Sequence, residues 1–543
     1  MQPPGRNGTI AAMRVLTGLT LVALVGCNAE EPPADTAPPS QLLPEEPAAQ
    51  PSPARLRRLT TAQYEASARH VLGDQVAMPS TLEPDGEAIG FASAAAAIDA
   101  LSALGVERYE DAAYFLADQR VADADALAAW LPCAPVDAAD TACVAASVEV
   151  LGERAWRRPL EAEEVDALVA LWAELAQADS PPTAWRYTLA ALLQSPYFLY
   201  RVEVGEEGLL RPHEWATRVS FLLWAAPPDD ELLAAAADGG LDTVEGRAAA
   251  VERLLADPRF EAGIRGFVTE WFHLERLDDF DKDPLIFQHA HPELGPAARE
   301  ETLQLAAWLG TSDADWRELL TSSVSFVDPR LAALYEVPAP TLEGFGPVTF
   351  GPERRGVLGH VSVLSGHSHA TRTSATGRGL FVRSTLLCQP VPEPPADVDT
   401  SLPEPDTTSP TLRDRLTTHL EEPGCAVCHL ITDPIGLGLE QFDAVGRFRT
   451  LEGGAPIDPS GELDGASFAD AAELGGVVAE HASLPGCWVD RWWVYGAGGD
   501  PPYETNEWLA ETFVASGHQL RPLLRAMATS EAFRRVESEG ARR

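Results

Sequence analysis

Apolar residues recur along most of this chain with the period of an α-helix. In the clearest segment, which begins at Glu161 just after Pro159, apolar side chains return every three or four residues. Acidic residues fill the first turn, where the helix dipole favours them. The sequence therefore predicts a helix that begins at Glu161. Its apolar face consists of Val165, Leu168, Val169, Trp172 and Leu175.

Similar patterns predict helices along the rest of the chain. One opens at Thr60 and closes at Gly73, and two more fill the last 40 residues. The others begin after Pro181-Pro182 and near His213, Thr243, Pro258, Pro296 and Thr411. Alternating patterns typical of strands are nearly absent, and the best candidate runs from Pro347 to Phe350. We therefore expect a mainly α protein of several packed helical modules with few or no strands.

Changes in composition divide the chain into segments, with Pro-rich separators around residues 337–353 and 389–410. We expect a signal peptide over 1–27, a disordered tether over 28–54, helical modules over 55–130, 131–205 and 206–340, a module over 350–450 that ends in a Cys-x-x-Cys-His motif, and a C-terminal helical module over 455–540. Four tryptophans on the predicted helices are expected in the core: Trp156, Trp172, Trp215 and Trp224.

The first 54 residues are typical of an exported lipoprotein. Arg6 and Arg14 precede a short apolar run that ends in Leu24-Val25-Gly26-Cys27, too short to span a bilayer. This resembles a bacterial lipoprotein signal peptide, which implies a lipid on the thiol of Cys27; a plain signal peptide or a short anchor is the alternative. Residue 28 is Asn rather than Asp, so the inner-membrane retention signal of enteric bacteria is absent and we expect the outer membrane. Residues 28–54 are mostly Ala, Glu and Pro and cannot form a core.

The charge of the chain excludes one class of partner. It has 82 acidic and 40 basic residues, a formal net charge of −42. Such a surface repels polyanions, so we expect no nucleic-acid partner. Lys282 is the single lysine, and the other basic residues are arginines.

The seven cysteines separate into roles. With Cys27 assigned to lipid, and Cys425 and Cys428 used together, four cysteines remain. These allow three disulfide connectivities, and sequence alone does not choose among them. The simplest pairing joins Cys133 to Cys143 and Cys388 to Cys487.

Cys425-Ala426-Val427-Cys428-His429 has the spacing at which c-type haem is attached. In such a motif two thiols form thioethers with the haem and the adjacent imidazole binds the iron. A zinc site usually needs a second ligand pair, and the chain has no second Cys-x-x-Cys. A thioredoxin-like motif expects a neighbouring βαβ unit. A structural disulfide between Cys425 and Cys428 stays open as an alternative.

Other residues are candidates for the surroundings of such a haem. A sixth iron ligand would come from Met527, His367 or His369, with His360, His419, His481 and His518 as further candidates, and five-coordinate iron is equally admissible. Met527 lies on an apolar helical stripe, which is more typical of a core residue. Arg447 and Arg449 are candidates for pairing with the haem propionates, the alternative being surface arginines.

Several short motifs lie in order along the chain. They are Arg57-Arg58-Leu59-Thr60-Thr61, Ala155-Trp156-Arg157-Arg158-Pro159-Leu160, Ser195-Pro196-Tyr197-Phe198-Leu199-Tyr200-Arg201, Arg218-Val219-Ser220-Phe221, Thr373-Ser374 with Arg378-Gly379, the stretch from Cys425 through Asp433-Pro434 to Arg449, and Ser530-Glu531-Ala532-Phe533. Together they resemble an exported, cytochrome-like family of planctomycetes and myxobacteria, which is built from consecutive domains of unknown function, numbered 1587, 1595, 1592, 1588 and 1585. One departure is Ala375, where the family usually has Pro. The resemblance implies a haem-bearing envelope protein without fixing a reaction.

Two rival sites are weaker matches to their patterns. Gly366-His367-Ser368-His369-Ala370 echoes the nucleophile turn of serine hydrolases but lacks its last glycine and the α/β surroundings. Asp279, Asp281 and Asp283 have the spacing of a calcium loop, yet Pro284 replaces the required glycine. An EF-hand is excluded, and only a looser calcium site stays open.

The sequence therefore predicts an exported, lipid-anchored protein with one covalent haem c. It would act in electron transfer, or as the redox part of an envelope oxidoreductase, with a redox partner protein. Its face of the outer membrane is open, and membrane contact is through the lipid alone. The alternative is a surface binding or scaffold lipoprotein whose cysteines form only disulfides.

Overall fold

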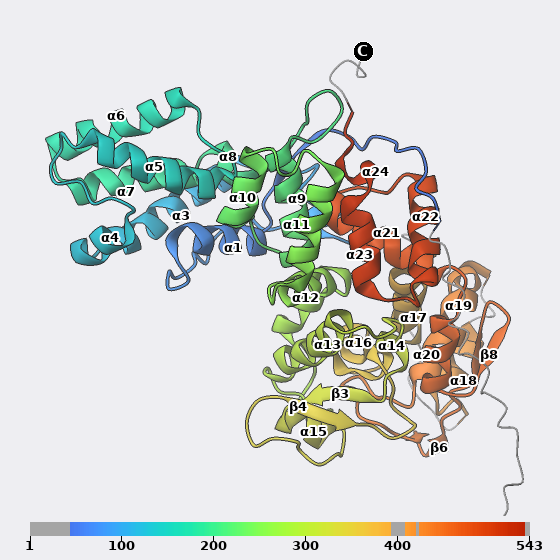
Figure 1. Cartoon of the computed structure of the whole chain (residues 1–543). Helices are drawn as coiled ribbons and strands as arrows, with labels where there is room; N and C mark the ends of the chain where they lie inside the picture. The colour runs from blue at the N-terminus through green and yellow to red at the C-terminus, as the bar shows by residue number, and fades with distance from the viewer. Residues whose placement is uncertain (1–43, 393–407, 420–422, 538–543) are drawn as a thin grey trace, which may run out of the picture. The chain divides into compact units, whose positions relative to one another are not determined.

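A computed structural model describes residues 44–392, 408–419 and 423–537 (Figure 1). The described residues are mainly helical, as the apolar period predicts, with short two-stranded pairs between the helices. Each predicted helix named above begins within two residues of its expected start. The mainly α fold class is therefore confirmed.

The first helical body has a core of its own around Tyr64, Trp172 and Trp185. Its helices are α1 (Thr61–Leu72), α3 (Ala103–Val121), α4 (Ala124–Trp130), α5 (Thr141–Trp156), α6 (Ala162–Ala178), α7 (Pro181–Leu193) and α8 (Pro196–Leu199). Its two ends meet because β1 (Arg55–Arg58) pairs antiparallel with β2 (Tyr200–Glu203). The short α2 (Ala92–Ala95) contributes Ala94 to the second core instead.

Local chemistry explains where α1 begins and ends. The Thr60 hydroxyl accepts from the backbone N–H of Gln63, and the Gln63 side chain accepts from that of Thr60. This reciprocal pair satisfies two N–H groups that a helix start leaves without partners. Gly73 ends the helix at a φ of +95°, which glycine adopts more readily than other residues.

A second core contains the helices that follow β2 together with the C-terminal helices. The first group is α9 (Pro212–Trp224), α10 (Asp230–Ala237), α11 (Val244–Ala256), α12 (Phe260–Trp271), η1 (Leu274–Asp279), α13 (Leu294–Thr311), α14 (Glu318–Thr321) and α15 (Pro329–Leu334). The C-terminal group is α20 (Ala471–Ala479), α21 (Leu484–Ala497), α22 (Tyr503–Ala515), α23 (Leu520–Thr529) and α24 (Glu531–Arg534). Phe267 of α12 and Trp492 of α21 stack with ring centroids 3.7 Å apart, joining the two groups.

The remaining elements lie between these two groups in sequence. They are η2 (Val357–Gly359), α16 (Val361–Gly366), α17 (Ala375–Leu380), η3 (Phe381–Leu386), α18 (Leu412–His419), α19 (Pro423–Gly436) and η4 (Leu437–Leu439). The other strand pairs are β3 (Val324–Val327), which lies between α14 and α15, with β4 (Gly346–Thr349), β5 (Leu451–Glu452) with β6 (Ala455–Pro456), and β7 (Gly461–Leu463) with β8 (Ala466–Phe468). The predicted strand at Pro347–Phe350 corresponds to β4.

A buried cluster of charges joins the N-terminal body to the rest. The carboxylate of Glu203 on β2 lies 2.6 Å from the guanidinium of Arg218 on α9, 3.1 Å from Arg201 and 3.5 Å from Arg57. Burial opposes ionisation of Glu203, but the guanidinium groups outweigh it and lower its pKa to about 2. Arg57 also donates to the carbonyl of Tyr495 on α21. The carboxylate of Glu203 therefore links β1, β2 and α9.

Residues 44–54, expected to belong to a disordered tether, lie against the C-terminal helices. The indole of Trp508 donates to the carbonyl of Pro44 at 2.9 Å, and Gln50 donates to Glu504 at 2.7 Å. Ser52 forms a parallel bridge with Val536. Backbone and polar side chains thus dock a segment whose composition supplies no core. The rest of the expected tether, 28–43, lies outside the described residues.

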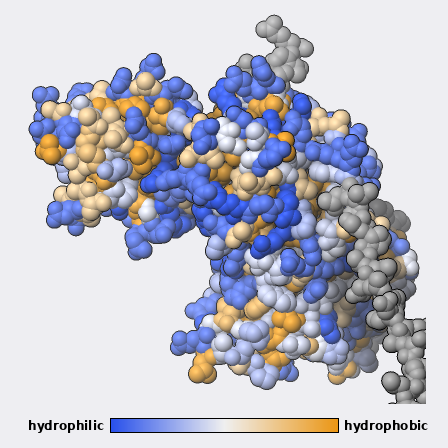
Figure 2. Space-filling model, in the orientation of Figure 1, coloured by the Kyte–Doolittle hydropathy of each residue, from blue (hydrophilic) through white to orange (hydrophobic). Residues whose placement is uncertain are grey.

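The face in Figure 2 is mainly hydrophilic, in keeping with the acidic composition. Apolar side chains are scattered over it, and the broadest apolar area lies over the helices of the N-terminal body. Lys282, the single lysine, is buried and donates to the carbonyl of Ser368 at 2.8 Å. Arginine therefore supplies the exposed side-chain cations of the described residues.

A buried polar network holds α13 to β3 and to the start of α16. Glu301 accepts from Ser325 at 2.9 Å and from the Tyr335 hydroxyl at 2.5 Å. The imidazole of His360 contacts Ser325 at 3.2 Å and Thr302 at 3.0 Å. Burial raises the pKa of Glu301 to about 8 and lowers that of His360 to about 3. Both groups are therefore neutral in the folded protein at pH 7.

Glu301→Gln is expected to flatten the loss of stability between pH 5 and pH 8. The folded protein keeps Glu301 protonated up to about pH 8, whereas the unfolded chain releases this proton above about pH 4.3. Stability from this raised pKa is thus complete below the unfolded value and is lost as the pH rises. At about 1.4 kcal/mol per pKa unit, the difference amounts to a few kcal/mol.

Urea unfolding at pH 5 and pH 8 measures this difference. Glu300→Gln is the control, because Glu300 is the partly exposed neighbour that pairs with Arg265. The control should keep the wild-type decline. An equal decline in Glu301→Gln would show that Glu301 does not titrate between these pH values. His360, whose pKa moves in the opposite direction, is common to all three proteins.

Candidate haem-attachment site

The Cys-x-x-Cys-His motif lies on the N-terminal half of α19. The helix continues through Pro434, and η4 follows it directly. Cys428 is a free cysteine, and its thiol contacts the carbonyl oxygen of Pro392 at 3.3 Å. The side chain of Cys425 lies outside the described residues. The structure does not pair Cys428 in a disulfide, as the alternative of a Cys425–Cys428 disulfide would require.

A carboxylate on the next turn of the same helix holds the imidazole of His429. Nδ1 of His429 lies 2.7 Å from Oδ2 of Asp433. The hydroxyl of Thr376 on α17 donates to the other oxygen of Asp433 at 2.8 Å and lies 3.3 Å from Nδ1. The hydrogen bond to Asp433 raises the pKa of His429. Nδ1 therefore points at a fixed acceptor, which selects the tautomer that carries its proton on Nδ1.

Two glycines bring α17 and α19 into backbone contact. A Cβ added at Gly379 would collide with the carbonyl oxygen of Thr432, and one added at Gly436 would collide with that of Ala375. Any side chain at either position would push the helices apart. Gly379 of the Arg378-Gly379 motif therefore serves this contact. Ser374 caps α17 by accepting from the N–H of Gly377.

Arg378 braces the turn that follows α19. Its guanidinium is fully buried and donates to the carbonyl oxygens of Leu439, Phe442, Asp443 and Leu364, at distances from 2.7 to 3.1 Å. These bonds satisfy several backbone acceptors of an irregular buried segment at once. The guanidinium thus ties the segment that follows α19 to α16.

Arg383 of η3 links α19 to two further segments. It donates to the carbonyl of Ile431 on α19 at 3.1 Å, to the Gln389 side chain at 2.5 Å and to Asp464 at 2.7 Å. The His481 ring also contacts Asp464, at 3.0 Å. One side chain therefore joins the motif helix, the segment after Cys388 and the β7–β8 turn.

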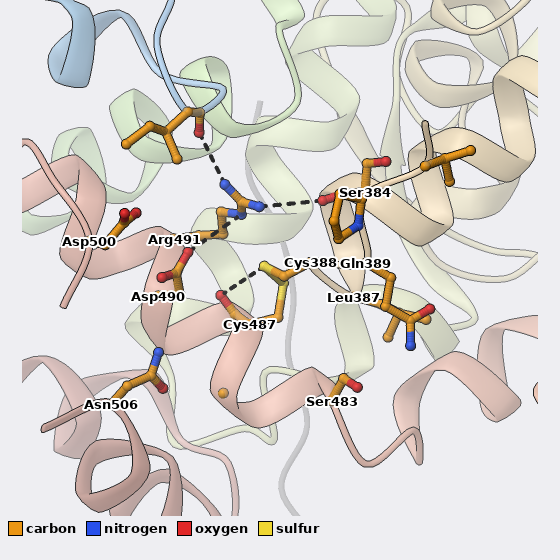
Figure 3. Close-up of a pocket in the computed structure, with 14 residues that line it drawn as sticks. Ser384, Leu387, Cys388, Gln389, Ser483, Cys487, Asp490, Arg491, Asp500 and Asn506 are labelled. Atoms are coloured by element: carbon orange, nitrogen blue, oxygen red, sulfur yellow. Dashed lines mark hydrogen bonds and ion pairs between the residues drawn. A yellow bond between two sulfur atoms is a disulfide. The ribbon is translucent and has the colours of Figure 1, made fainter. Parts of the chain in front are cut away.

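Both disulfides of the simplest pairing are present. Cys133 is bonded to Cys143, and Cys388 to Cys487. The second bond ties the end of η3 to α21 and lines a cavity of about 660 Å³ (Figure 3). In the same cavity Arg491 donates to the carbonyl of Ser384 at 3.4 Å. Pro392, against which Cys428 lies, follows this disulfide by four residues.

The structure gives both arginines predicted for the haem propionates a carboxylate partner. Arg447 is exposed and pairs with Glu336 at 2.8 Å. Arg449 donates to the buried Glu440 at 2.9 Å, and Glu440 also accepts from Thr373. Arg449 therefore stabilises the chain after α19, and the assignment of either arginine to a propionate stays a prediction.

The structure places three of the candidates for a sixth ligand in different surroundings. Met527 is fully buried in the second core, and His369 is exposed. The ring of His367 packs on Phe381 with centroids 4.7 Å apart. The carbonyl of His367 faces Gly377, whereas Gly379 faces α19. Two residues turn a helix by about 200°, so α17 separates His367 from α19. Whether the iron has a sixth ligand stays a prediction.

The described residues do not complete the serine hydrolase site or the calcium site considered above. The hydroxyl of Ser368 donates to the carbonyl of Leu364 at 2.7 Å rather than to a histidine. Asp283 accepts from the N–H of Leu285, and Asp281 pairs with Lys282. The part of the chain that the structure describes holds no group of three or more His, Cys, Asp or Glu placed to share a metal ion.

One aromatic residue expected in a core lines a cavity instead. Trp172, Trp215 and Trp224 are buried as predicted. Trp156 is half-buried at a cavity of about 500 Å³, and its indole donates to the carbonyl of Leu192. The guanidinium of Arg158 stands over the rings of Trp156 and Tyr197. The family-like Ala155–Leu160 motif therefore forms part of the wall between the N-terminal body and α9.

Two residues of this site, Asp433 and Thr376, were not predicted from the sequence. Asp433 carried a signal, because residues four apart share a helix face and Asp433 follows His429 by four. Thr376 carried none, because its contact depends on the packing of α17 against α19. The predicted signal peptide and Cys27 lie outside the described residues. None of the described helices is long and apolar enough to cross a membrane.

Fold and site define a mainly α, multi-module protein that carries a Cys-x-x-Cys-His motif on a tightly packed helix. Four consecutive segments match family models: residues 57–122 match Protein of unknown function (DUF1587), 143–203 match Protein of unknown function (DUF1595), 210–337 match Protein of unknown function (DUF1592), and 354–452 match Protein of unknown function (DUF1588). Four of the five domain types that the resemblance implies, and their order, are thus confirmed, and the fifth stays a prediction. No curated protein and no solved structure matches the chain.

Proposed function

We propose that this chain is an exported lipoprotein with one covalent c-type haem on α19. It would act in electron transfer or as the redox part of an envelope oxidoreductase. The observation that carries the proposal is the geometry of α19. A free Cys428 precedes His429, whose Nδ1 is held by Asp433 at 2.7 Å. A histidine that binds a metal through one nitrogen commonly donates from the other to a carboxylate.

The residues present suit a porphyrin at this place. A thioether needs a thiol that is not in a disulfide, and Cys428 meets this requirement. Leu430 and Ile431, which follow the motif, expose 61% and 36% of their surface. Exposed apolar side chains beside a polar site are typical of a surface that binds something. A porphyrin would supply an apolar face for them.

The residues at and around the motif have different roles in this proposal. Cys425 and Cys428 would hold the haem, and His429 would bind its iron from the peptide side. Asp433 and Thr376 orient the imidazole, while Arg378 fixes the backbone that follows. When bound, the haem supplies one-electron exchange between iron(III) and iron(II).

The cellular setting belongs to the same proposal. The lipobox-like sequence that ends in Cys27 supports lipid anchoring, and haem c is attached outside the cytoplasm. The outer membrane is favoured by Asn28. With a net charge of −42, electrostatic steering favours a redox partner with a basic face.

A haem spectrum tests the proposal. The chain is produced in an exporting host that has c-type haem maturation, and a pyridine haemochrome spectrum is recorded after denaturation. We expect one haem per chain that stays attached, and its loss in the double variant Cys425→Ser/Cys428→Ser. The matched control Cys133→Ala/Cys143→Ala removes two other cysteines and should retain haem. A folded, colourless wild type would contradict the proposal and leave the disulfide-stapled scaffold.

A further inference from the structure

We infer that Asp433 is a positioning residue that lowers the reduction potential of the haem iron bound to His429, and that Thr376 moderates its effect. The inference rests on the proposed function. It assigns a role to two residues that the motif alone leaves without one. The role follows from the contacts of Asp433 and from elementary ligand chemistry.

Asp433 reaches His429 because both lie on one face of α19. The two residues are four apart, and the distance from Nδ1 to Oδ2 is 2.7 Å. Asp433 is only 2% exposed, so water screens its charge weakly. Among the described residues, the ion pair given for Asp433 is with His429 and not with an arginine. Its negative charge therefore acts mainly on the imidazole.

The second oxygen of Asp433 is held by a hydroxyl group. Thr376 donates to Oδ1 at 2.8 Å, while the hydroxyl of Thr432 lies 3.2 Å from Oδ1 and donates to the nearer carbonyl of Cys428, at 3.0 Å. Hydroxyl donors fix the carboxylate in place and withdraw part of its charge. Because Thr376 belongs to α17, the backbone contact at Gly379 keeps this donor in position. The strength of Asp433 as an acceptor is thus set by a second helix.

The effect on iron follows from these contacts. A carboxylate that accepts the Nδ1 proton makes the imidazole a more basic ligand through its other nitrogen. A more basic ligand, with a buried negative charge behind it, stabilises iron(III) relative to iron(II). The couple exchanges one electron with the redox partner, and the hydrogen-bonded proton stays between Nδ1 and Asp433. Removing the charge should therefore raise the potential.

Thr376 should act in the opposite direction. Without its hydroxyl, Oδ1 of Asp433 loses its donor at 2.8 Å, so the carboxylate holds more negative charge and becomes a stronger acceptor for Nδ1. The ligand becomes more basic, and the potential falls. A merely structural role for these side chains would not produce opposite signs.

Spectroelectrochemical titration of the haem-loaded, full-length chain tests the inference. Asp433→Asn keeps the shape of the side chain and is expected to raise the midpoint potential by at least 59 mV, a tenfold change for one electron. Thr376→Val is expected to lower it. Asp458→Asn removes one exposed carboxylate and should leave the potential near that of wild type. It controls for the change in net charge.

The outcomes separate this inference from the function on which it rests. A wild-type chain without covalent haem contradicts the proposed function. Haem in all proteins with an unchanged potential in Asp433→Asn contradicts the inference alone. If Asp433→Asn does not fold or load haem, Thr376→Val decides, because an unchanged or raised potential there would also overturn the inference.

Discussion

Replacing Glu203 with alanine is expected to lower the free energy of unfolding by about 3–5 kcal/mol, the range for breaking a buried ion pair by removing one partner. The carboxylate is the counter-ion of Arg57, Arg201 and Arg218, each of which is at most 2% exposed. Its removal leaves three buried guanidinium groups without this counter-ion. Since these groups come from β1, β2 and α9, the N-terminal body should also loosen from the rest.

Urea unfolding, followed by circular dichroism, measures this effect. Glu206→Ala is the matched control, because Glu206 pairs with Arg211 at 3.4 Å on the surface. Exposed pairs contribute at most about 1 kcal/mol. If both variants lost the same small amount of stability, the cluster would be dispensable. Two transitions in Glu203→Ala would show that the N-terminal body unfolds separately.

Replacing Cys388 and Cys487 with alanine is expected to cost about 2–5 kcal/mol. The disulfide closes a loop between residues that are 99 apart in sequence, so it restricts the unfolded chain strongly. It also anchors the segment that leads to Pro392, against which the thiol of Cys428 lies. The variant should therefore be less stable, and the haem proposed above would have a less uniform environment in it.

Removing the other disulfide provides the comparison. Cys133 and Cys143 are only 10 residues apart, and the chain-entropy relation makes their bond about 2 kcal/mol less stabilising. Guanidinium unfolding of the two double variants measures the difference. Equal losses would indicate that native-state contacts, rather than loop length, determine what each disulfide contributes.

Helices and their starts could be predicted because both are local. The apolar stripe after Glu161 and the cap at Thr60 depend on residues within one or two turns, and α6 and α1 begin where these patterns indicate. Residues 44–54 could not be predicted in the same way. Their docking depends on partners such as Trp508, far away in sequence, and composition carries no trace of such contacts.

The candidate site also has a part that could be predicted from local sequence and a part that depends on contacts between distant residues. Cys425, Cys428 and His429 could be proposed from spacing alone, because the chemistry of attachment requires adjacent residues. The pairing of Arg449 with Glu440 and the separation of His367 from α19 depend on how α17, α19 and the following turn pack. The positive charge of Arg447 and Arg449 suggested that they pair with haem propionates. The sequence could not reveal that Arg449 already pairs with the buried carboxylate of Glu440.

The backbone contact at Gly379 and Gly436 has a kinetic consequence for the proposed function. These glycines seat the helix that carries His429 directly on its neighbour, which would limit how far this helix could move during electron exchange. A centre whose geometry is nearly the same in both oxidation states needs little reorganisation energy. The rate of electron exchange would then depend on two glycines that allow α17 and α19 to come into backbone contact.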